Sequence, residues 1–130
     1  MLEKGIKGRA ETVVTDKNTA ITAGSGNLPV FATPFMTALM EEAAWKAVAP
    51  YLEEGQGTVG TSLSITHDAA TPVGMKVWAE CELIEVDKRR LVFTVEAFDE
   101  AGSIGKGKHE RFIIQSEKFL VRTKSKLAKE

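Results

Sequence analysis

The stretch Thr33-Pro34-Phe35-Met36-Thr37-Ala38-Leu39-Met40-Glu41-Glu42-Ala43-Ala44-Trp45-Lys46-Ala47-Val48-Ala49-Pro50 decides the fold. It is rich in Ala, Leu, Met and Glu, which are good helix formers. Thr33 can cap a helix and Pro34 suits the first helical position, whereas Pro50 cannot continue a helix. The sequence therefore predicts one long helix from about Phe35 to Ala49, which begins at a Thr33 cap.

The segments around this helix have the alternation of β-strands. After it, apolar residues recur at every second position in residues 61–67, 75–86 and 90–98, and residues 105–115, which end in Phe112-Ile113-Ile114, are the last clear strand. Residues 87–89 and 99–102 are typical of tight links between antiparallel neighbours. We expect an opening strand at residues 7–14, a loop at residues 53–57, and a last strand with a basic tail at about residues 117–130.

This order of elements defines a fold class. One helix followed by a run of strands with short links predicts an α+β protein, in which an antiparallel sheet packs on the helix. A length of 130 residues fits one domain that spans residues 1–130. The strand faces follow from alternation, so that Leu63, Ile65 and His67 are expected to face the helix together.

Composition excludes several classes of protein. The formal net charge of -1 indicates attraction neither to nucleic acid nor to a membrane surface. No apolar run is long enough for a signal peptide or a membrane span, and the single cysteine, Cys81, cannot form an internal disulfide. The sequence contains no CxxC, HExxH, Walker or GxGxxG motif. We therefore expect a cytoplasmic protein without a metal or other cofactor.

Glu41 has an unusual place on the predicted helix. At about 100° per residue, Glu41 lies near 80° from Thr33, inside the arc of apolar side chains, whereas Glu42 and Lys46 share the opposite, solvent face. A carboxylate inside an apolar arc is costly to bury unless it is paired or used. Glu41 is thus either an edge residue that reaches solvent or a structural partner, or a buried carboxylate with a raised pKa suited to acid–base chemistry.

Thr33 and the two histidines each allow a structural and a functional interpretation. Thr33 is a helix cap or, at the same place, a hydroxyl beside backbone N–H groups that can stabilise a negatively charged oxygen. His67, at the end of its strand, is a structural histidine or a catalytic base facing the helix. His109 shares its strand face with Gly105, Gly107 and Arg111, and we interpret it as structural because the glycines indicate close approach of another backbone.

Taken together, these segments resemble the fluoroacetyl-CoA thioesterase group of the hotdog superfamily. The resemblance rests on residues 30–41 and 49–53, on Gly60-Thr61 through Thr66-His67 and residues 69–72, and on residues 105–111 and 117–119. It implies a hotdog fold, in which the sheet wraps around a central helix, and a homodimer. It further implies that Thr33, Glu41 and His67 are the catalytic residues and that the backbone of Gly60 lies near the thioester.

One departure from the group concerns the acyl pocket. The fluoroacetyl-specific enzyme has phenylalanines shortly before the helix that close over the acyl group, but here residues 24–29 contain no aromatic residue before Phe31. The resemblance therefore supports thioester hydrolysis much better than it supports selectivity for the fluoroacetyl group. We take Asn27, Leu28 and Phe31 as candidate substrate contacts in a more open pocket.

The predicted reaction is hydrolysis of a short-chain acyl-CoA to the free acid and CoA. His67 would act as general base and acid, Thr33 would place its hydroxyl at the carbonyl, and Glu41 would orient the imidazole or attack the thioester. Arg122 and Lys124 in the basic tail are either solvated or bind the CoA phosphates. Two other functions fit the same fold: a protein that binds acyl-CoA without cleaving it, and an acyl-CoA hydratase or dehydratase.

Overall fold

The computed structural model describes residues 2–127 and contains one sheet and one long helix. The elements follow in the order β1 (Lys7–Val13), α1 (Ala20–Ala23), α2 (Thr33–Val48), the 3₁₀ turn η1 (Ala49–Tyr51), β2 (Gln56–His67), β3 (Lys76–Asp87), β4 (Arg90–Asp99), β5 (Gly102–Gln115), α3 (Ser116–Lys124) and the 3₁₀ turn η2 (Ser125–Leu127). Among the described residues, no helix is long and apolar enough to cross a membrane.

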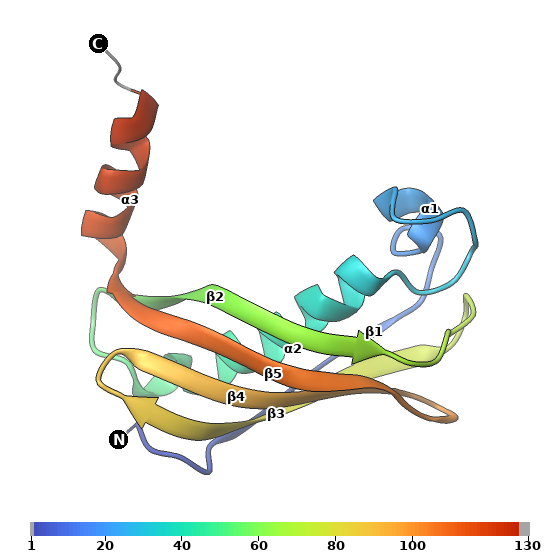
Figure 1. The fold of residues 1–130 in the computed structure, drawn as a ribbon, viewed down its shortest axis with the longest axis horizontal. Coiled ribbons are helices and arrows are strands. Elements are labelled where there is room, and N and C mark those ends of the chain that lie inside the picture. The colour runs from blue at the N-terminus through green and yellow to red at the C-terminus, as the bar shows by residue number, and fades with distance from the viewer. Residues whose placement is uncertain (1, 128–130) are drawn as a thin grey trace.

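The five strands form one antiparallel sheet in the order β1-β3-β4-β5-β2. This sheet curves around α2, as Figure 1 shows, and leaves β1 and β2 at its two edges. The predicted α+β class and the wrapped arrangement of sheet and helix are therefore confirmed.

The core lies between α2 and the sheet. Residues of α2 that face the sheet are buried, and so are alternate residues of β3 and β4, as their sequence alternation predicts. The buried side chains from these three elements include Met36, Met40, Ala43, Ala44, Val48, Val77, Ala79, Cys81, Leu83, Leu91, Phe93, Val95 and Ala97. Gly8 lets β1 approach α2 closely, because an added Cβ there would lie 2.5 Å from the carbonyl oxygen of Ala43.

Three boundaries differ from the sequence-based prediction. β2 begins at Gln56, inside the expected loop, because residues 56–60 pair with the end of β5. β5 begins at Gly102, immediately after the β4–β5 turn. The expected last strand at residues 117–130 is wrong: residues 116–124 form the helix α3, and residues 128–130 of the expected tail lie outside the described residues.

Candidate active site

Thr33 and His67 meet at the N-terminus of α2. The hydroxyl oxygen of Thr33 lies 2.7 Å from Nδ1 of His67, across 34 residues of sequence. His67 is the last residue of β2, so the end of one strand and the start of the helix place this pair. The expectation that His67 points toward the helix is confirmed.

The cap of α2 differs from the prediction. Ala32, not Thr33, is the N-cap residue, and no side chain accepts a capping hydrogen bond there. Thr33 is the first helical residue and Pro34 the second. The Thr33 hydroxyl is therefore not used to cap the helix and is available to His67.

His67 has one ring nitrogen engaged and one free. Nδ1 contacts Thr33, whereas Nε2 is enclosed and has no hydrogen-bond partner among the described residues. Burial lowers the pKa of His67 below its ordinary value, although the nearby backbone of Ala69 and the charge of Asp68 act in the other direction. The imidazole is thus held largely neutral near pH 7, the form that can accept a proton.

Glu41, on α2, belongs to a second cluster, whose other members lie on β5 and β2. Its carboxylate lies 3.6 Å from the guanidinium of Arg111, whose side chain is 7% exposed, while Glu41 itself is 43% exposed. In the single chain, Glu41 thus lies at the edge of the apolar arc with a charged partner and is partly exposed. Thr58 in turn holds Arg111, through its hydroxyl at 2.8 Å and its carbonyl oxygen at 3.1 Å.

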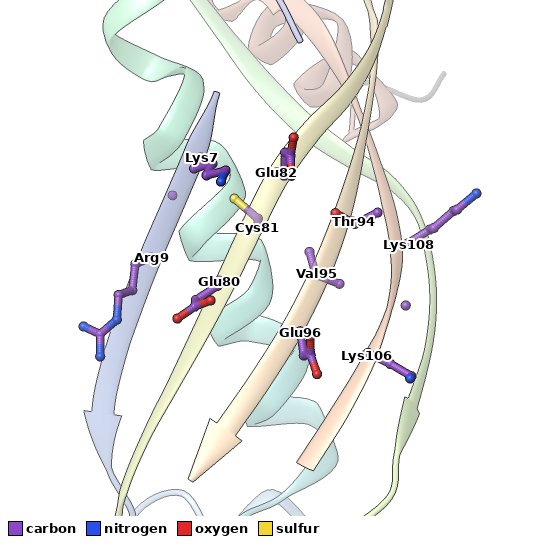
Figure 2. Close-up of a pocket in the computed structure, with 12 residues that line it drawn as sticks. Lys7, Arg9, Glu80, Cys81, Glu82, Thr94, Val95, Glu96, Lys106 and Lys108 are labelled. Carbon is purple, nitrogen blue, oxygen red and sulfur yellow. The ribbon is translucent and has the colours of Figure 1, made fainter. Parts of the chain in front are cut away.

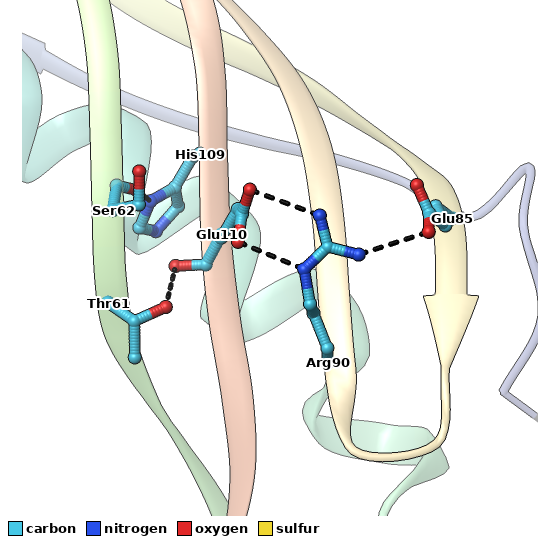
Figure 3. Close-up of polar contacts among 6 residues, drawn as sticks. All are labelled: Thr61, Ser62, Glu85, Arg90, His109 and Glu110. Atoms are coloured by element: carbon cyan, nitrogen blue, oxygen red, sulfur yellow. Dashed lines mark hydrogen bonds and ion pairs between the residues drawn. The ribbon is translucent and has the colours of Figure 1, made fainter.

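His109 is buried beside this cluster. Its Nδ1 lies 2.9 Å from the carbonyl oxygen of Ser62, its Nε2 lies 3.1 Å from Arg111, and its ring stacks on Phe93. Figure 3 shows the ring of His109 directed at Ser62, while on the other face of the sheet Arg90 binds Glu110 and Glu85. Burial lowers the pKa of His109 as well. These contacts agree with a structural histidine that supports Arg111.

Gly60 provides the space for the Glu41 carboxylate. A Cβ at Gly60 would lie 2.6 Å from Oε2 of Glu41 and 3.2 Å from Cε1 of His109. The pairing of β2 with β5 shifts register between Gly60 and Ser62, which bends the edge strand at this point. The structure thus places Gly60 beside Glu41 and shows why a side chain is absent there.

The remaining candidate residues lie apart from the Thr33–His67 pair or have other contacts. Phe31 is 1% exposed and packs in the core, so a contact between Phe31 and substrate stays a prediction. Asn27 and Leu28 lie in an exposed loop between α1 and α2. Arg122 and Lys124 are exposed on α3, which leaves the end of the sheet opposite the N-terminus of α2 (Figure 1).

Sequence reasoning missed Arg111 as the partner of Glu41. The only signal was that alternation puts Arg111 and His109 on the inner face of β5. A buried guanidinium needs an anion or several acceptors. This requirement could have suggested a carboxylate on the helix that packs against β5. The distance of 70 residues between Glu41 and Arg111 gave no further indication.

A groove of about 880 Å³ lies elsewhere, on the outer face of the sheet. Figure 2 shows its charged side chains standing on β1, β3, β4 and β5. The cations Lys7, Arg9, Lys106 and Lys108 alternate with the anions Glu80, Glu82 and Glu96. It contains no residue of the Thr33–His67 pair or of the Glu41 cluster, and its mixed charges favour hydration over a single ligand. We therefore do not assign the reaction to this groove.

The site supplies acid–base chemistry. A neutral imidazole and a hydroxyl at a helix N-terminus can take part in proton transfer and in binding a negatively charged oxygen, and the Glu41 carboxylate held by Arg111 lies in a separate cluster. Among residues 2–127, no cluster of three or more His, Cys, Asp or Glu side chains is suited to hold a metal ion.

An antiparallel sheet around one long helix, with this polar pair at the start of the helix, defines a hotdog-fold thioesterase. Two solved structures share the architecture. A hot-dog-like protein from Thermanaerovibrio acidaminovorans superposes with a TM-score of 0.88 at 19% identity over 99% of this chain and 96% of its own. A thioesterase superfamily member from Thermus thermophilus superposes with a TM-score of 0.89 at 31% identity over 100% and 98%.

The more specific relatives agree with one another. The family model described as fluoroacetyl-CoA-specific thioesterase matches residues 14–117, so the chain belongs to that family. The fluoroacetyl-CoA thioesterase of Streptantibioticus cattleyicolor is 50% identical over 97 residues, which are 75% of this chain and 70% of that protein. A structure of the fluoroacetyl-CoA thioesterase FlK superposes with a TM-score of 0.91 at 40% identity over 97% of this chain and 98% of that one. The protein is thus an enzyme that hydrolyses acyl-CoA thioesters.

Proposed function

We propose that the enzyme hydrolyses short-chain acyl-CoA thioesters with Thr33, Glu41 and His67 as its catalytic residues. The observation that carries this proposal is the 2.7 Å contact between Thr33 and His67 at the start of α2. His67 takes a proton from the water that attacks either the thioester or an anhydride formed with Glu41, and it can return that proton to the CoA thiolate. Nδ1–H of His67 donates to the Thr33 hydroxyl oxygen, which leaves the lone pair of Nε2 for the proton.

The first turn of α2 offers one backbone donor to the thioester oxygen. Pro34 has no N–H, and the N–H groups of Phe35 and Met36 bond to the carbonyl oxygen of Ala32. The N–H of Thr33 is free of those bonds and lies beside its own hydroxyl. In this proposal it binds the oxyanion that forms when the carbonyl is attacked, where the helix dipole adds to the stabilisation.

Glu41 and Thr33 of one chain are too far apart to act on one thioester. Eight residues on a helix span roughly 12 Å along its axis at 1.5 Å per residue. We therefore propose a homodimer in which Glu41 of one subunit complements Thr33 and His67 of the other. The unpaired edge strand β2, which carries Gly60 beside Glu41 and ends at His67, is the surface that supports such a dimer.

The role of Glu41 has two versions, attack on the thioester or activation of a water. Label found in Glu41 after a single turnover in H₂¹⁸O shows attack by Glu41, because water that opens the enzyme-bound anhydride at the Glu41 carbonyl leaves ¹⁸O in that carboxylate, whereas direct attack by water puts the label only into the product acid. Glu41→Gln removes the charge and keeps the shape, so we expect a large loss of kcat in either version. A rate near that of the wild type would leave Glu41 as a mere ion-pair partner of Arg111.

The acyl group is proposed to be short and loosely selected. Leu28 is exposed in the loop before α2, and no phenylalanine precedes Phe31 there to close over the acyl group. An open pocket rejects few acyl groups, because shape provides the discrimination. We expect acetyl-CoA to be cleaved at a rate comparable with that of fluoroacetyl-CoA, the substrate in the names of the relatives.

A panel of acyl-CoAs with a thiol reagent tests the proposal. Release of free CoA from short acyl-CoAs is the expected result. A protein that only binds acyl-CoA would release no thiol, and a hydratase would instead change the absorbance of an enoyl-CoA. A preference of many orders of magnitude for fluoroacetyl-CoA would show that residues other than a phenylalanine lid supply selectivity.

We further propose that the enzyme acts in the cytoplasm and without a cofactor. Cys81, the single cysteine, is a free thiol, which fits a reducing compartment. The proposed chemistry needs only proton transfer and a charged carboxylate, so activity should persist after dialysis against a chelator. Arg122 and Lys124 remain candidates for contact with the CoA phosphates.

A further inference from the structure

α3 has an apolar side with no visible partner in its own chain. None of its residues is buried, and its contacts with the sheet are made with β5. Phe119, Leu120 and Leu127 are exposed; Phe119 and Leu120 lie on one side of α3, and Leu127 in η2 continues it at helical spacing. Arg122 and Lys124 lie on the two borders of this apolar side, whereas Lys118 and the exposed Val121 lie on the opposite side of the helix. A short amphipathic helix of this kind is marginal in water unless it packs on something.

The place where α3 begins indicates what covers it. α3 follows Gln115, which pairs with Gln56 at the first residue of β2, and Figure 1 shows α3 extending away from the sheet beyond β2. β2 is an edge strand of 12 residues without a single charged residue among Gln56–His67, except for the titratable His67 itself. A long, uncharged edge is the kind of strand that pairs with another chain.

Two-fold pairing of β2 with its own copy fixes what α3 would meet. In an antiparallel pair the first residue of one strand lies opposite the last residue of the other, so Gln56 of one subunit faces the His67 end of its partner. α3 spans roughly 13 Å at 1.5 Å per residue, which reaches beyond one added strand spaced about 4.8 Å away. The segment it would cross holds the exposed residues Ile21, Leu28 and Phe35, which offer an apolar surface.

We propose that α3 docks in trans, over the loop of residues 24–30 and the start of α2 in the partner subunit, and there contacts the phosphates of the partner's CoA. Its apolar side covers the exposed apolar residues beside the acyl site, which supplies a cover that the loop itself lacks. Arg122 and Lys124 border this apolar side on its two flanks, and there they reach the mouth of that site, where CoA carries its negative charge. This inference rests on the proposed dimer and the proposed thioesterase site.

Mixed dimers test the trans arrangement. One subunit carries His67→Ala with an intact α3, and the other carries Arg122→Glu and Lys124→Glu with an intact His67, each with its own affinity tag. The charge-reversed homodimer should have a KM for acyl-CoA raised roughly tenfold at low salt and less at high salt. In the mixed dimer, the active site with His67 receives the intact α3 from its partner, so its KM should return to within about twofold of the wild-type value.

Two outcomes of the mixed-dimer experiment would contradict trans docking of α3. A mixed dimer with the KM of the charge-reversed homodimer would show that α3 acts in its own chain. An unchanged KM in the charge-reversed homodimer would remove α3 from CoA binding altogether.

A cross-link tests docking without any reference to activity. Mild oxidation of a mixture of Leu28→Cys and Leu120→Cys subunits should give a covalent dimer that neither variant gives alone. Cys81 is buried, and burial raises the pKa of its thiol to about 11, so the native cysteine should stay unreactive. A disulfide within one chain of the double variant, or no covalent dimer in the mixture, would overturn trans docking. If no acyl-CoA is hydrolysed by the wild type, the proposed function fails while this result still decides where α3 lies.

Discussion

At the scale of single residues, the division of labour between the two histidines can be tested directly. His67→Ala removes the proposed base and should lower kcat by roughly 10²- to 10⁴-fold, the usual effect of losing a general base. His109→Asn is the matched control, because His109 supports Arg111 and Ser62 from a buried position. It should lower the urea midpoint of unfolding and leave kcat close to the wild-type value. A large loss of kcat with an unchanged urea midpoint would mean that His109 is the catalytic histidine.

Thr33 offers a second test at this scale. Thr33→Ser keeps the hydroxyl that contacts His67 and should be mild, whereas Thr33→Ala should lower kcat strongly. Because Ala32 is the N-cap and no side chain caps α2, the alanine variant should not lose the roughly 1 kcal/mol of a broken cap. Unfolding curves measured beside kcat check this. If the pair acts as a unit, Thr33→Ala combined with His67→Ala should lose little more than His67→Ala, and simple multiplication of the two losses would count against the assignment.

The pH dependence follows from the burial of His67. The neutral imidazole is the active base, and burial lowers its pKa, so the acid limb of log(kcat/KM) should have its midpoint below pH 6.5. The stability of the folded protein should also decrease as the pH falls. Because the folded pKa values of His67 and His109 lie below the unfolded ones, the unfolded chain binds more protons, and stability is lost as the pH falls from about 6.5 through the lowered values. Urea midpoints from pH 7 to 5 check this, and a flat profile would contradict it.

The orientation of His67 could be predicted from the sequence, whereas the partner of Glu41 could not. The alternation Leu63, Ile65, His67 was enough to point the imidazole at the helix, because the faces of a strand have a period of two. For Glu41, its angle around the helix axis showed a carboxylate among apolar side chains. The angle did not identify its partner, because contact with Arg111 depends on how β5 crosses the helix. The cap at Ala32 was missed because Thr33 has the composition of a cap, and only the backbone conformation identifies the cap residue.

At the scale of elements, the β3–β4 turn contains a small local strain. Lys88, in the link between Asp87 and Arg90, has φ of +58°, a left-handed conformation that costs a residue with a Cβ about 1 kcal/mol. Lys88→Gly should therefore stabilise the protein by up to about 1 kcal/mol and leave kcat unchanged, because the turn lies outside the proposed site. Urea denaturation checks the shift. Lys108→Gly is a contrasting variant, since glycine inside β5 should destabilise, and a loss of stability at Lys88 would contradict the strain.

α3 shows where the element prediction failed. Phe119, Leu120 and Val121 are consecutive apolar residues, which a short window cannot assign to a strand or a helix. A strand needs a neighbour to pair with. The pairing of β5 ends at Gln115 with β2 and at Phe112 with β4, so a strand that continued past Gln115 would have no partner on either side. The helix therefore follows from the completed sheet, which the local sequence does not specify. The long segments with strong periodicity, α2, β3 and β4, were predicted correctly because burial repeats many times in each.

At the scale of the whole molecule, the two edges of the sheet are not alike. β1 presents Lys7, Arg9 and Glu11, and Arg9 and Lys76 both pair with Glu11 along this edge. Charged side chains on an edge strand oppose pairing with another sheet. β2 has no such protection, and it carries both Gly60, next to Glu41, and His67. The asymmetry indicates that one edge is closed to partners and the other is open where the proposed site needs a second subunit.

This asymmetry predicts a dimer that a charge on one edge can break. Ser62 lies near the middle of β2, so in a two-fold antiparallel pair Ser62→Asp would bring two carboxylates close together across the axis. We expect light scattering at micromolar concentration to give a dimer for the wild type and a large shift toward monomer for Ser62→Asp. Activity should fall with the dimer, because a lone subunit cannot bring Glu41 to Thr33 and His67. Thr12→Asp puts the same charge on the β1 edge and should stay dimeric and active; a wild-type monomer, or equal effects at the two edges, would refute assembly through β2.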